Sequence, residues 1–254
     1  KSLSFDLIYG LPHQSEQSFS KTLAKVIRLG PDRIACYNYA HLPNRFTSQR
    51  AIDRLTLPSA TQRLQLQRLI DTTLADSGYV LIGLDHYVKT TDELSVAQRE
   101  GRLQRNFQGY SLKSAEDMMG IGHSAISQIG DMIVQNARNL DDYLAKTEAY
   151  ESPISRGLKL TQDDLLRRDI IMDICCKLEF SLSEICQRYG YQAQSYLKKE
   201  IEDLQEFVAD GLINETGSGY RLTTLGRHFL RNLCMVFDAW LEQTPVDIKY
   251  SKTV

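Results

Sequence analysis

The chain has 254 residues, of which 42% are hydrophobic and 24% are charged, and its formal net charge at pH 7 is −2. This composition indicates a globular protein with one large domain, or with a medium and a small one. It offers no overall basic field for nucleic acid, no apolar run of the roughly 18 residues that a membrane span needs, and no visible signal peptide. The five cysteines are expected to be reduced, buried thiols of a cytoplasmic protein.

The first part of the chain alternates between predicted strands and helices. A strand over residues 3–9 is followed by an amphipathic helix that opens near Ser15 and by a second strand over residues 33–39. This order predicts two parallel strands joined by a right-handed crossover. A longer helix over residues 59–77 and a third strand over residues 79–84 continue the pattern. The sequence therefore indicates an α/β fold.

Ligands of parallel sheets bind beyond the carboxyl ends of the strands, which directs attention to residues 9–12 and 39–43. Two histidines, His41 and His86, follow predicted strands, but no third ligand at metal spacing accompanies them, so no metal site is expected. Asp6 lies within the first strand. It is either a charge at a strand edge or a pocket carboxylate that accepts hydrogen bonds from a ligand, and the pattern leaves both interpretations open.

Three arginines mark the next candidate site. Residues 97–110 read Ala-Gln-Arg-Glu-Gly-Arg-Leu-Gln-Arg-Asn-Phe-Gln-Gly-Tyr, which we interpret as a Gly-broken loop. The aromatic and amide neighbours argue against a solvated charge face. Because arginine pairs bidentately with carboxylates, the loop predicts a site for a polycarboxylate ligand, with Arg99 and Arg105 as the candidate contacts. A run of small residues over 120–127 lets backbone approach a ligand closely, and it leads into a predicted hairpin over residues 124–136.

The end of the chain differs in character. After a short helix over residues 141–149, the pattern predicts helices over 165–178, 182–189 and 195–209, two short strands within 211–222 and a last helix over 224–241. This order is typical of a winged-helix module, so we predict domains over 1–160 and 161–254. The third of these helices carries four acids against two lysines between residues 195 and 206, which opposes DNA binding.

Five stretches of the chain resemble the oxygen-independent coproporphyrinogen III oxidases, the radical S-adenosylmethionine (SAM) enzymes of haem synthesis. They read Asp-Leu-Ile-Tyr-Gly-Leu-Pro from residue 6, Asn-Tyr-Ala-His-Leu-Pro from 38, Gln-Arg-Glu-Gly from 98, Arg-Asn-Phe-Gln-Gly-Tyr from 105 and Ser-Ala-Ile-Ser from 124. The first is shared with sister radical SAM proteins, whereas the last two are much more specific. Haem-trafficking relatives carry a Gly-x-Gly-Ala-His type run that this chain lacks.

The resemblance implies the later part of a radical SAM (β/α)6 partial barrel, followed by a small, mostly helical, winged-helix-like domain. The implied reaction is oxidative decarboxylation of coproporphyrinogen III to protoporphyrinogen IX. In it a 5′-deoxyadenosyl radical removes a β-hydrogen of a propionate, CO2 leaves, and an external electron acceptor takes the remaining electron. The complete protein is expected to be a cytoplasmic monomer that uses SAM and a [4Fe–4S] cluster on a tetrapyrrole substrate, without nucleic acid.

The same resemblance implies particular site residues. Asp6 and Ala40 match positions that contact the SAM bound to the cluster, and Gln108 and Ile126 match positions near a second SAM molecule. A substrate with four propionates also suits the arginine-rich stretch. No catalytic residue is assigned.

One departure from the family is large, because the chain lacks its Cys-x3-Cys-x2-Cys cluster motif. By the resemblance, the cluster ligands and the first barrel strands would precede Lys1, and the chain is expected to be a C-terminal half that is inactive by itself. No metal ligand is assigned within it. Two alternatives stay open: a tetrapyrrole or haem carrier with the same barrel, and a winged-helix interaction module.

Overall fold

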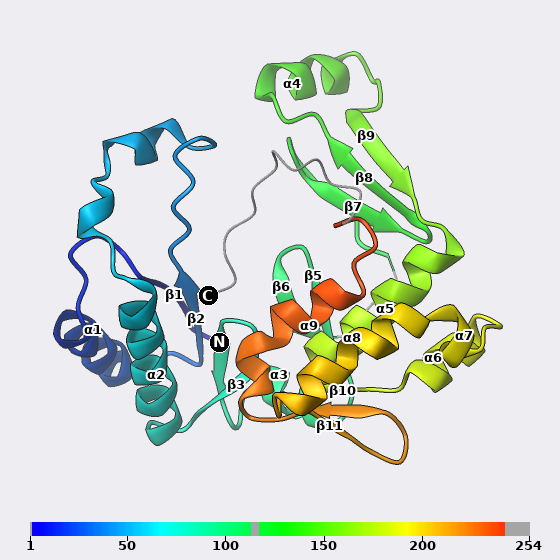
Figure 1. Cartoon of the computed structure of the whole chain (residues 1–254). Coiled ribbons are helices and arrows are strands. Elements are labelled where there is room, and N and C mark those ends of the chain that lie inside the picture. Colours follow the sequence, from blue (N-terminus) through cyan, green and yellow to red (C-terminus); the bar gives the residue numbers. More distant parts are fainter. Residues whose placement is uncertain (1, 113–116, 242–254) are drawn as a thin grey trace.

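The computed structural model describes residues 2–112 and 117–241 (Figure 1). In this view the first two strands and the helices α1 and α2 lie on one side and the C-terminal helices on the other. The strands β3 to β6 lie between these two groups. A separate small sheet with α4 stands above the C-terminal helices.

A four-stranded sheet in the order β1-β2-β4-β3 forms the first part. Strands β1 (Ser4–Tyr9) and β2 (Arg33–Asn38) are parallel, which confirms the predicted strand–helix–strand unit. The third predicted strand, β3 (Tyr79–Gly83), does not pair with β2. Instead a strand that the sequence analysis did not predict, β4 (His86–Lys89), turns back after β3 and lies between them, antiparallel to both.

The two helices that follow β1 and β2 are fixed by capping and by apolar spacing. α1 (Glu16–Leu29) begins with a capping box in which Ser15 and Ser18 satisfy each other's backbone N–H groups, and it ends at Gly30, whose φ of 64° suits glycine. α2 (Ala60–Asp76) begins with a second capping box. Both helices bury one face against the sheet, through Phe19, Leu23, Val26, Leu66, Ile70 and Leu74.

The arginine-rich stretch is regular structure, which corrects the prediction of a loop. It consists of α3 (Glu93–Arg99) and the antiparallel hairpin β5 (Leu103–Asn106) and β6 (Gly109–Leu112). Both elements were missed because they are short: α3 spans two turns, and each hairpin strand has four residues.

The predicted second hairpin is present as β7 (Ile126–Ile129) and β8 (Met132–Asn136), followed by α4 (Leu140–Glu148). A third strand, β9 (Ile154–Lys159), extends this sheet to the order β7-β8-β9. Every residue of β9 is exposed. It therefore lacks the alternation of buried and exposed positions by which a strand is recognised in a sequence.

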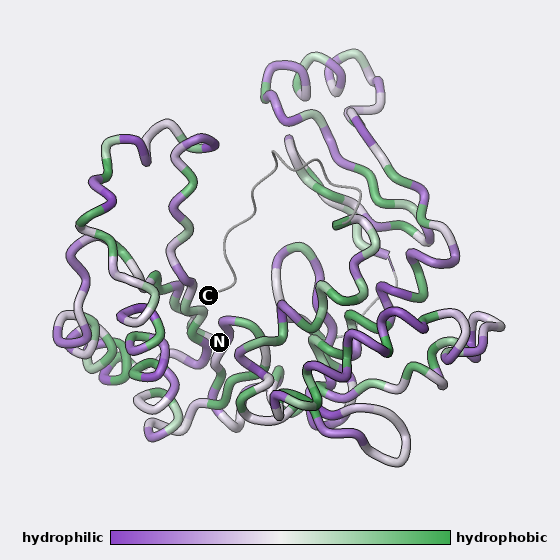
Figure 2. Tube along the Cα trace, in the orientation of Figure 1, coloured by the Kyte–Doolittle hydropathy of each residue, from purple (hydrophilic) through white to green (hydrophobic). Residues whose placement is uncertain are grey.

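The C-terminal part has the element order of a winged helix. α5 (Gln162–Lys177), β10 (Glu179–Phe180) and α6 (Leu182–Arg188) precede α8 (Lys198–Ala209), and a sheet of order β10-β12-β11 closes the unit. β11 and β12 span Ile213–Glu215 and Tyr220–Leu222. In Figure 2 hydrophobic and hydrophilic residues alternate along these helices, and the apolar ones include the buried residues Leu166, Ile185 and Leu204.

Two predicted helices of this part are shorter than expected. The helix predicted over 195–209 is divided into α7 (Ala193–Tyr196) and α8. The helix predicted over 224–241 is a 3-10 turn, η3 (Gly226–Phe229), followed by α9 (Leu230–Val236). A Cβ on Gly226 would lie 1.8 Å from the carbonyl oxygen of Leu212, so only glycine allows the start of η3 to approach the residue before β11 this closely.

The larger hydrophobic core crosses residue 160. It joins Ile82, Val88 and Leu94 to the buried face of α5, including Leu166 and Ile170. A smaller core lies between the sheet and the helices α1 and α2. The division into domains at residue 160 therefore stays a prediction, because side chains from both sides of it share one core.

Candidate functional site

One face of the four-stranded sheet carries the predicted pocket carboxylate. The register places Asp6 of β1 opposite Ala35 of β2, and Ala35 opposite His86 of β4. Phe5, Ile34 and Tyr87 alternate with these positions and belong to the core under α1 and α2. Asp6 and Tyr37 are exposed on the opposite face, which we call the inner face.

The hairpin β5–β6 brings Arg105 and Tyr110 to this face. They are directly opposite each other in the hairpin, with the Arg105 guanidinium carbon 5.2 Å from the centroid of the Tyr110 ring. The His86 ring lies edge-on to Tyr110, with centroids 5.3 Å apart, and edge-on to Tyr37 at 6.0 Å. The sequence analysis did not select these two tyrosines, because only the long-range pairing of β4 and the hairpin places them here.

The electrostatics of this cluster keep His86 neutral. Burial, and after it the neighbouring Arg105 cation, lower the pKa of His86 to about 4, against the raising effect of Asp6. Burial also raises the pKa of Tyr37 above its ordinary value, and Asp6 acts in the same direction. Among the described residues, the inner face therefore combines the Arg105 guanidinium and the exposed Asp6 side chain with a neutral His86 imidazole.

Arg105 is available for a ligand, whereas the other two arginines of the stretch have protein partners. Within the described ranges no carboxylate pairs with Arg105, and its Nη1 is buried without a hydrogen-bond partner. Arg99 donates from Nη1 to the hydroxyl of Ser95 at 2.8 Å and to a backbone carbonyl. Arg102 pairs with Glu100. A guanidinium nitrogen buried without a partner is costly, so Arg105 is the member of this stretch that best suits a carboxylate ligand.

The remaining predicted residues lie on three different elements or connections. Ala40 follows the end of β2 and is half-buried. Gln108 is exposed in the turn of the β5–β6 hairpin, where its backbone N–H donates to the Asn106 side chain at 2.9 Å. Ile126 is half-buried at the start of β7. No described contact joins these three residues to one another, and their roles toward SAM stay predictions.

The small-residue run before β7 packs against the chain itself. A Cβ on Gly120 would lie 2.6 Å from the carbonyl oxygen of Ile126, so glycine here permits close contact with that strand. The Gly120 N–H donates to the Ser127 hydroxyl at 3.0 Å, and the Asn136 amide donates to the carbonyl of Gly122 at 2.9 Å. The run thereby shapes the backbone beside Ile126, which is one of the predicted contacts.

The cysteines do not form a cluster site. All five are free; Cys36 lies in the smaller core and Cys186 in the larger one. Cys175 and Cys234 contact each other, with sulfur atoms 3.6 Å apart. In the described part of the chain no group of three His, Cys, Asp or Glu side chains could hold a metal ion.

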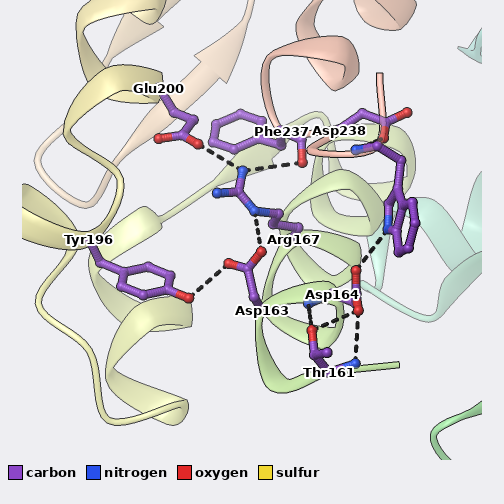
Figure 3. A network of polar contacts seen from close by, with 9 residues as sticks. Thr161, Asp163, Asp164, Arg167, Tyr196, Glu200, Phe237 and Asp238 are labelled. Carbon is purple, nitrogen blue, oxygen red and sulfur yellow. Dashed lines mark hydrogen bonds and ion pairs between the residues drawn. The ribbon is translucent and has the colours of Figure 1, made fainter. Parts of the chain in front are cut away.

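One acidic side chain of α8, that of Glu200, stabilises the packing of the helices. Glu200 is buried and accepts a hydrogen bond of 2.7 Å from Arg167, which also pairs with Asp163 at 2.8 Å (Figure 3). Tyr196 donates to the same Asp163. This network joins α5, α7 and α8, so Glu200 serves the packing of the C-terminal part. No described helix has the length and apolar character needed to cross a membrane.

Comparison with known proteins relates both parts of the chain to one family. The family model of the HemN C-terminal domain matches residues 160–229. The oxygen-independent coproporphyrinogen III oxidase of Salmonella typhimurium is 41% identical over 253 residues, covering 100% of this chain and 55% of the relative. That of Thermostichus vulcanus is 43% identical over 245 residues, covering 96% of this chain and 75% of the relative.

A solved structure agrees with these sequence matches. It is described as "Coproporphyrinogen III oxidase (HemN) from Escherichia coli is a Radical SAM enzyme" and superposes with a TM-score of 0.89 at 41% identity. The match covers 94% of this chain and 55% of that structure. The chain thus spans about half the length of most of the relatives it matches here.

Proposed function

The chain belongs to the family of the oxygen-independent coproporphyrinogen III oxidases, and from this premise we propose that it is part of an enzyme that converts coproporphyrinogen III to protoporphyrinogen IX. The chain forms the later part of a radical SAM barrel and a winged-helix-like C-terminal part. Besides the family relationship, the structural observation that best supports this activity is the environment of Arg105. This residue is a half-buried cation on the inner face of the sheet that forms no salt bridge with any described carboxylate, and the substrate carries four propionates.

The residues of the inner face have distinct proposed tasks. Arg105 binds one propionate through the free edge of its guanidinium. The Tyr110 ring holds that guanidinium in place by a cation–π contact. The neutral His86 adds no second positive charge beside it. Arg99 is a weaker candidate for the substrate than Arg105, because its guanidinium already binds Ser95 and a backbone carbonyl.

SAM and a [4Fe–4S] cluster are the proposed cofactors, and together they would supply the radical that starts the reaction. The described residues suit an adenosyl ligand: the exposed carboxylate of Asp6 can accept hydrogen bonds, and the backbone of Ala40 follows the carboxyl end of β2. Gln108 and Ile126 are the proposed contacts of a second SAM. The same residues do not suit the cluster, since no three-thiolate set is present among them.

The proposed substrate class is a tetrapyrrole, with an external electron acceptor as the second partner. The five free cysteines support the cytoplasm as the compartment, because structural thiols persist in reducing surroundings. A monomer is the proposed state of the complete protein.

The test is a product assay on the complete, anaerobically reconstituted protein with coproporphyrinogen III and SAM. We expect protoporphyrinogen IX and about two CO2 per substrate, since two propionates become vinyl groups. Binding of haem or porphyrin without any product, in protein whose cluster is intact, would instead favour a tetrapyrrole carrier and overturn the proposal.

A further inference from the structure

The segment that follows β2 is held in a fixed shape by side chains that come later in the chain. The connection between β2 and α2 contains two 3-10 turns, η1 (Thr47–Ala51) and η2 (Arg54–Thr56). No residue of η1 is buried, and Gln49 is its half-buried member. Its side chain reaches the backbone of residues 40–42, which follow the end of β2.

The Gln49 amide makes two hydrogen bonds with the turn at the end of β2. Its Oε1 accepts the backbone N–H of Leu42 at 2.5 Å, and its Nε2 donates to the carbonyl of Ala40 at 3.1 Å. Arg50 adds a third bond, from Nε to the carbonyl of Pro43 at 3.1 Å. A glutamine amide is suited to this task because it carries a donor and an acceptor on one planar group.

A second glutamine does the same at the end of β1. Gln14 accepts the N–H of Gly10 at 2.6 Å through Oε1 and donates to the carbonyl of Ile8 at 3.3 Å through Nε2. In each case the amide joins the carbonyl of one residue to the N–H of the residue two positions later. Neighbouring backbone in a sheet makes the same pair of bonds, so each glutamine takes the place of a strand partner where the strand ends.

We propose that Gln49 is a positioning residue for the cofactor site, where its amide holds residues 40–42 in the shape that presents Ala40 to SAM. The inference rests on the proposed function, because the contact of Ala40 with SAM belongs to that proposal. Gln14 makes the same pair of bonds at the end of β1, but residues 8–10 include none of the four residues named as SAM contacts, which are Asp6, Ala40, Gln108 and Ile126. It is therefore the matched control that the chain itself provides.

The experiment compares Gln49→Met with Gln14→Met in the complete, anaerobically reconstituted protein. Hydrogen exchange reports whether each turn has opened, and equilibrium dialysis with S-adenosylhomocysteine, an unreactive probe, reports cofactor affinity. We expect faster exchange at residues 40–42 in Gln49→Met and at residues 8–10 in Gln14→Met. The probe should bind about 5- to 30-fold more weakly to Gln49→Met, as the loss of two hydrogen bonds predicts, and within about twofold of wild type to Gln14→Met.

Gln49→Glu separates the two bonds of the amide. A carboxylate still accepts the Leu42 N–H but cannot donate to the Ala40 carbonyl. We expect slow exchange at Leu42 together with weakened probe binding. In kinetics, both Gln49 variants should raise the KM for SAM more than they lower kcat.

Three outcomes would overturn the inference. Equal weakening by the Gln14 and Gln49 variants would mean a general loosening of the sheet edge. Unchanged probe affinity despite faster exchange would mean that the turn does not shape the site, and unchanged exchange would mean that the bonds do not hold it. Failure of the proposed function is distinguishable, because the wild-type protein would then form no protoporphyrinogen IX in the product assay, whatever the probe affinities of the two variants.

Discussion

Arg105 and Tyr110 face each other across the β5–β6 ladder, with the guanidinium carbon 5.2 Å from the ring centroid. The phenol of Tyr110 donates to the carbonyl of Cys175 in α5 at 3.1 Å. The sulfur of Met172, also in α5, accepts the backbone N–H of Arg105 at 3.4 Å. The C-terminal part therefore fixes the position of Arg105, the arginine of this stretch whose guanidinium has neither a carboxylate nor a hydrogen-bond partner among the described residues.

Arg105→Leu should impair turnover of coproporphyrinogen III about ten- to a hundred-fold in the complete enzyme, because a propionate loses its charge-assisted partner. Arg99→Leu should have a smaller effect, since Arg99 already binds within its own helix. Steady-state kinetics with the cluster intact, together with SAM affinity, measure both. Arg102→Leu removes an exposed pair with Glu100 and is the control. Equal losses for all three variants would contradict the assignment of Arg105.

Asp6→Ala should weaken SAM binding at least tenfold and abolish turnover without unfolding the protein. The carboxylate is exposed on the inner face, so its loss removes a hydrogen-bond acceptor and leaves no cavity in a core. Equilibrium dialysis with SAM and a thermal melt measure the two effects. Asp76→Ala, at the exposed end of α2, is the control. Wild-type SAM affinity in the Asp6 variant would remove this residue from the site.

Arg167→Met should lower the free energy of unfolding by about 3 kcal/mol, because Asp163 and the buried Glu200 would both lose their partner. Lys198→Met breaks an exposed pair with Glu202 and should change stability by no more than about 0.5 kcal/mol. Urea unfolding followed by circular dichroism measures both variants. A loss in Arg167→Met as small as that of the control would show that the network in Figure 3 is not stabilising.

His86 should make stability depend on pH between about 6.5 and 4. Burial depresses its folded-state pKa from 6.5 to about 4, so the unfolded chain binds the proton first as the pH falls. The stability that the neutral ring provides is complete above pH 6.5 and is lost progressively down to pH 4, by a total on the order of 3 kcal/mol.

The His86 contribution is isolated by comparing wild type with His86→Gln across this range. Asp71 and Asp85, whose pKa values are raised by burial, act in the opposite direction, and the comparison cancels them. The unfolding free energy of wild type minus that of His86→Gln should therefore decrease as the pH falls from 6.5 to 4. A difference that does not change with pH would show that His86 is not held neutral by its surroundings.

Much of the fold could be predicted from the sequence because it depends on local chemistry. The capping residues Ser15 and Ser59, the apolar spacing of α1 and the stop at Gly30 define their elements without reference to distant residues. The parallel pairing of β1 with β2 follows from the short helix between them. The family could likewise be recognised, since its motifs are contiguous runs of sequence.

Only the tertiary structure decided the composition of the site. β4 enters between β2 and β3 through pairings up to 55 positions apart, that of Arg33 with Val88, and no local pattern encodes that choice. Arg99 and Arg105 look equivalent in the sequence, yet one binds its own helix and the other has no carboxylate partner in the described ranges. Gln49 was not selected at all. Hydrogen-bond satisfaction is a property of what surrounds each polar group, so it is fixed only when the distant segments have packed together.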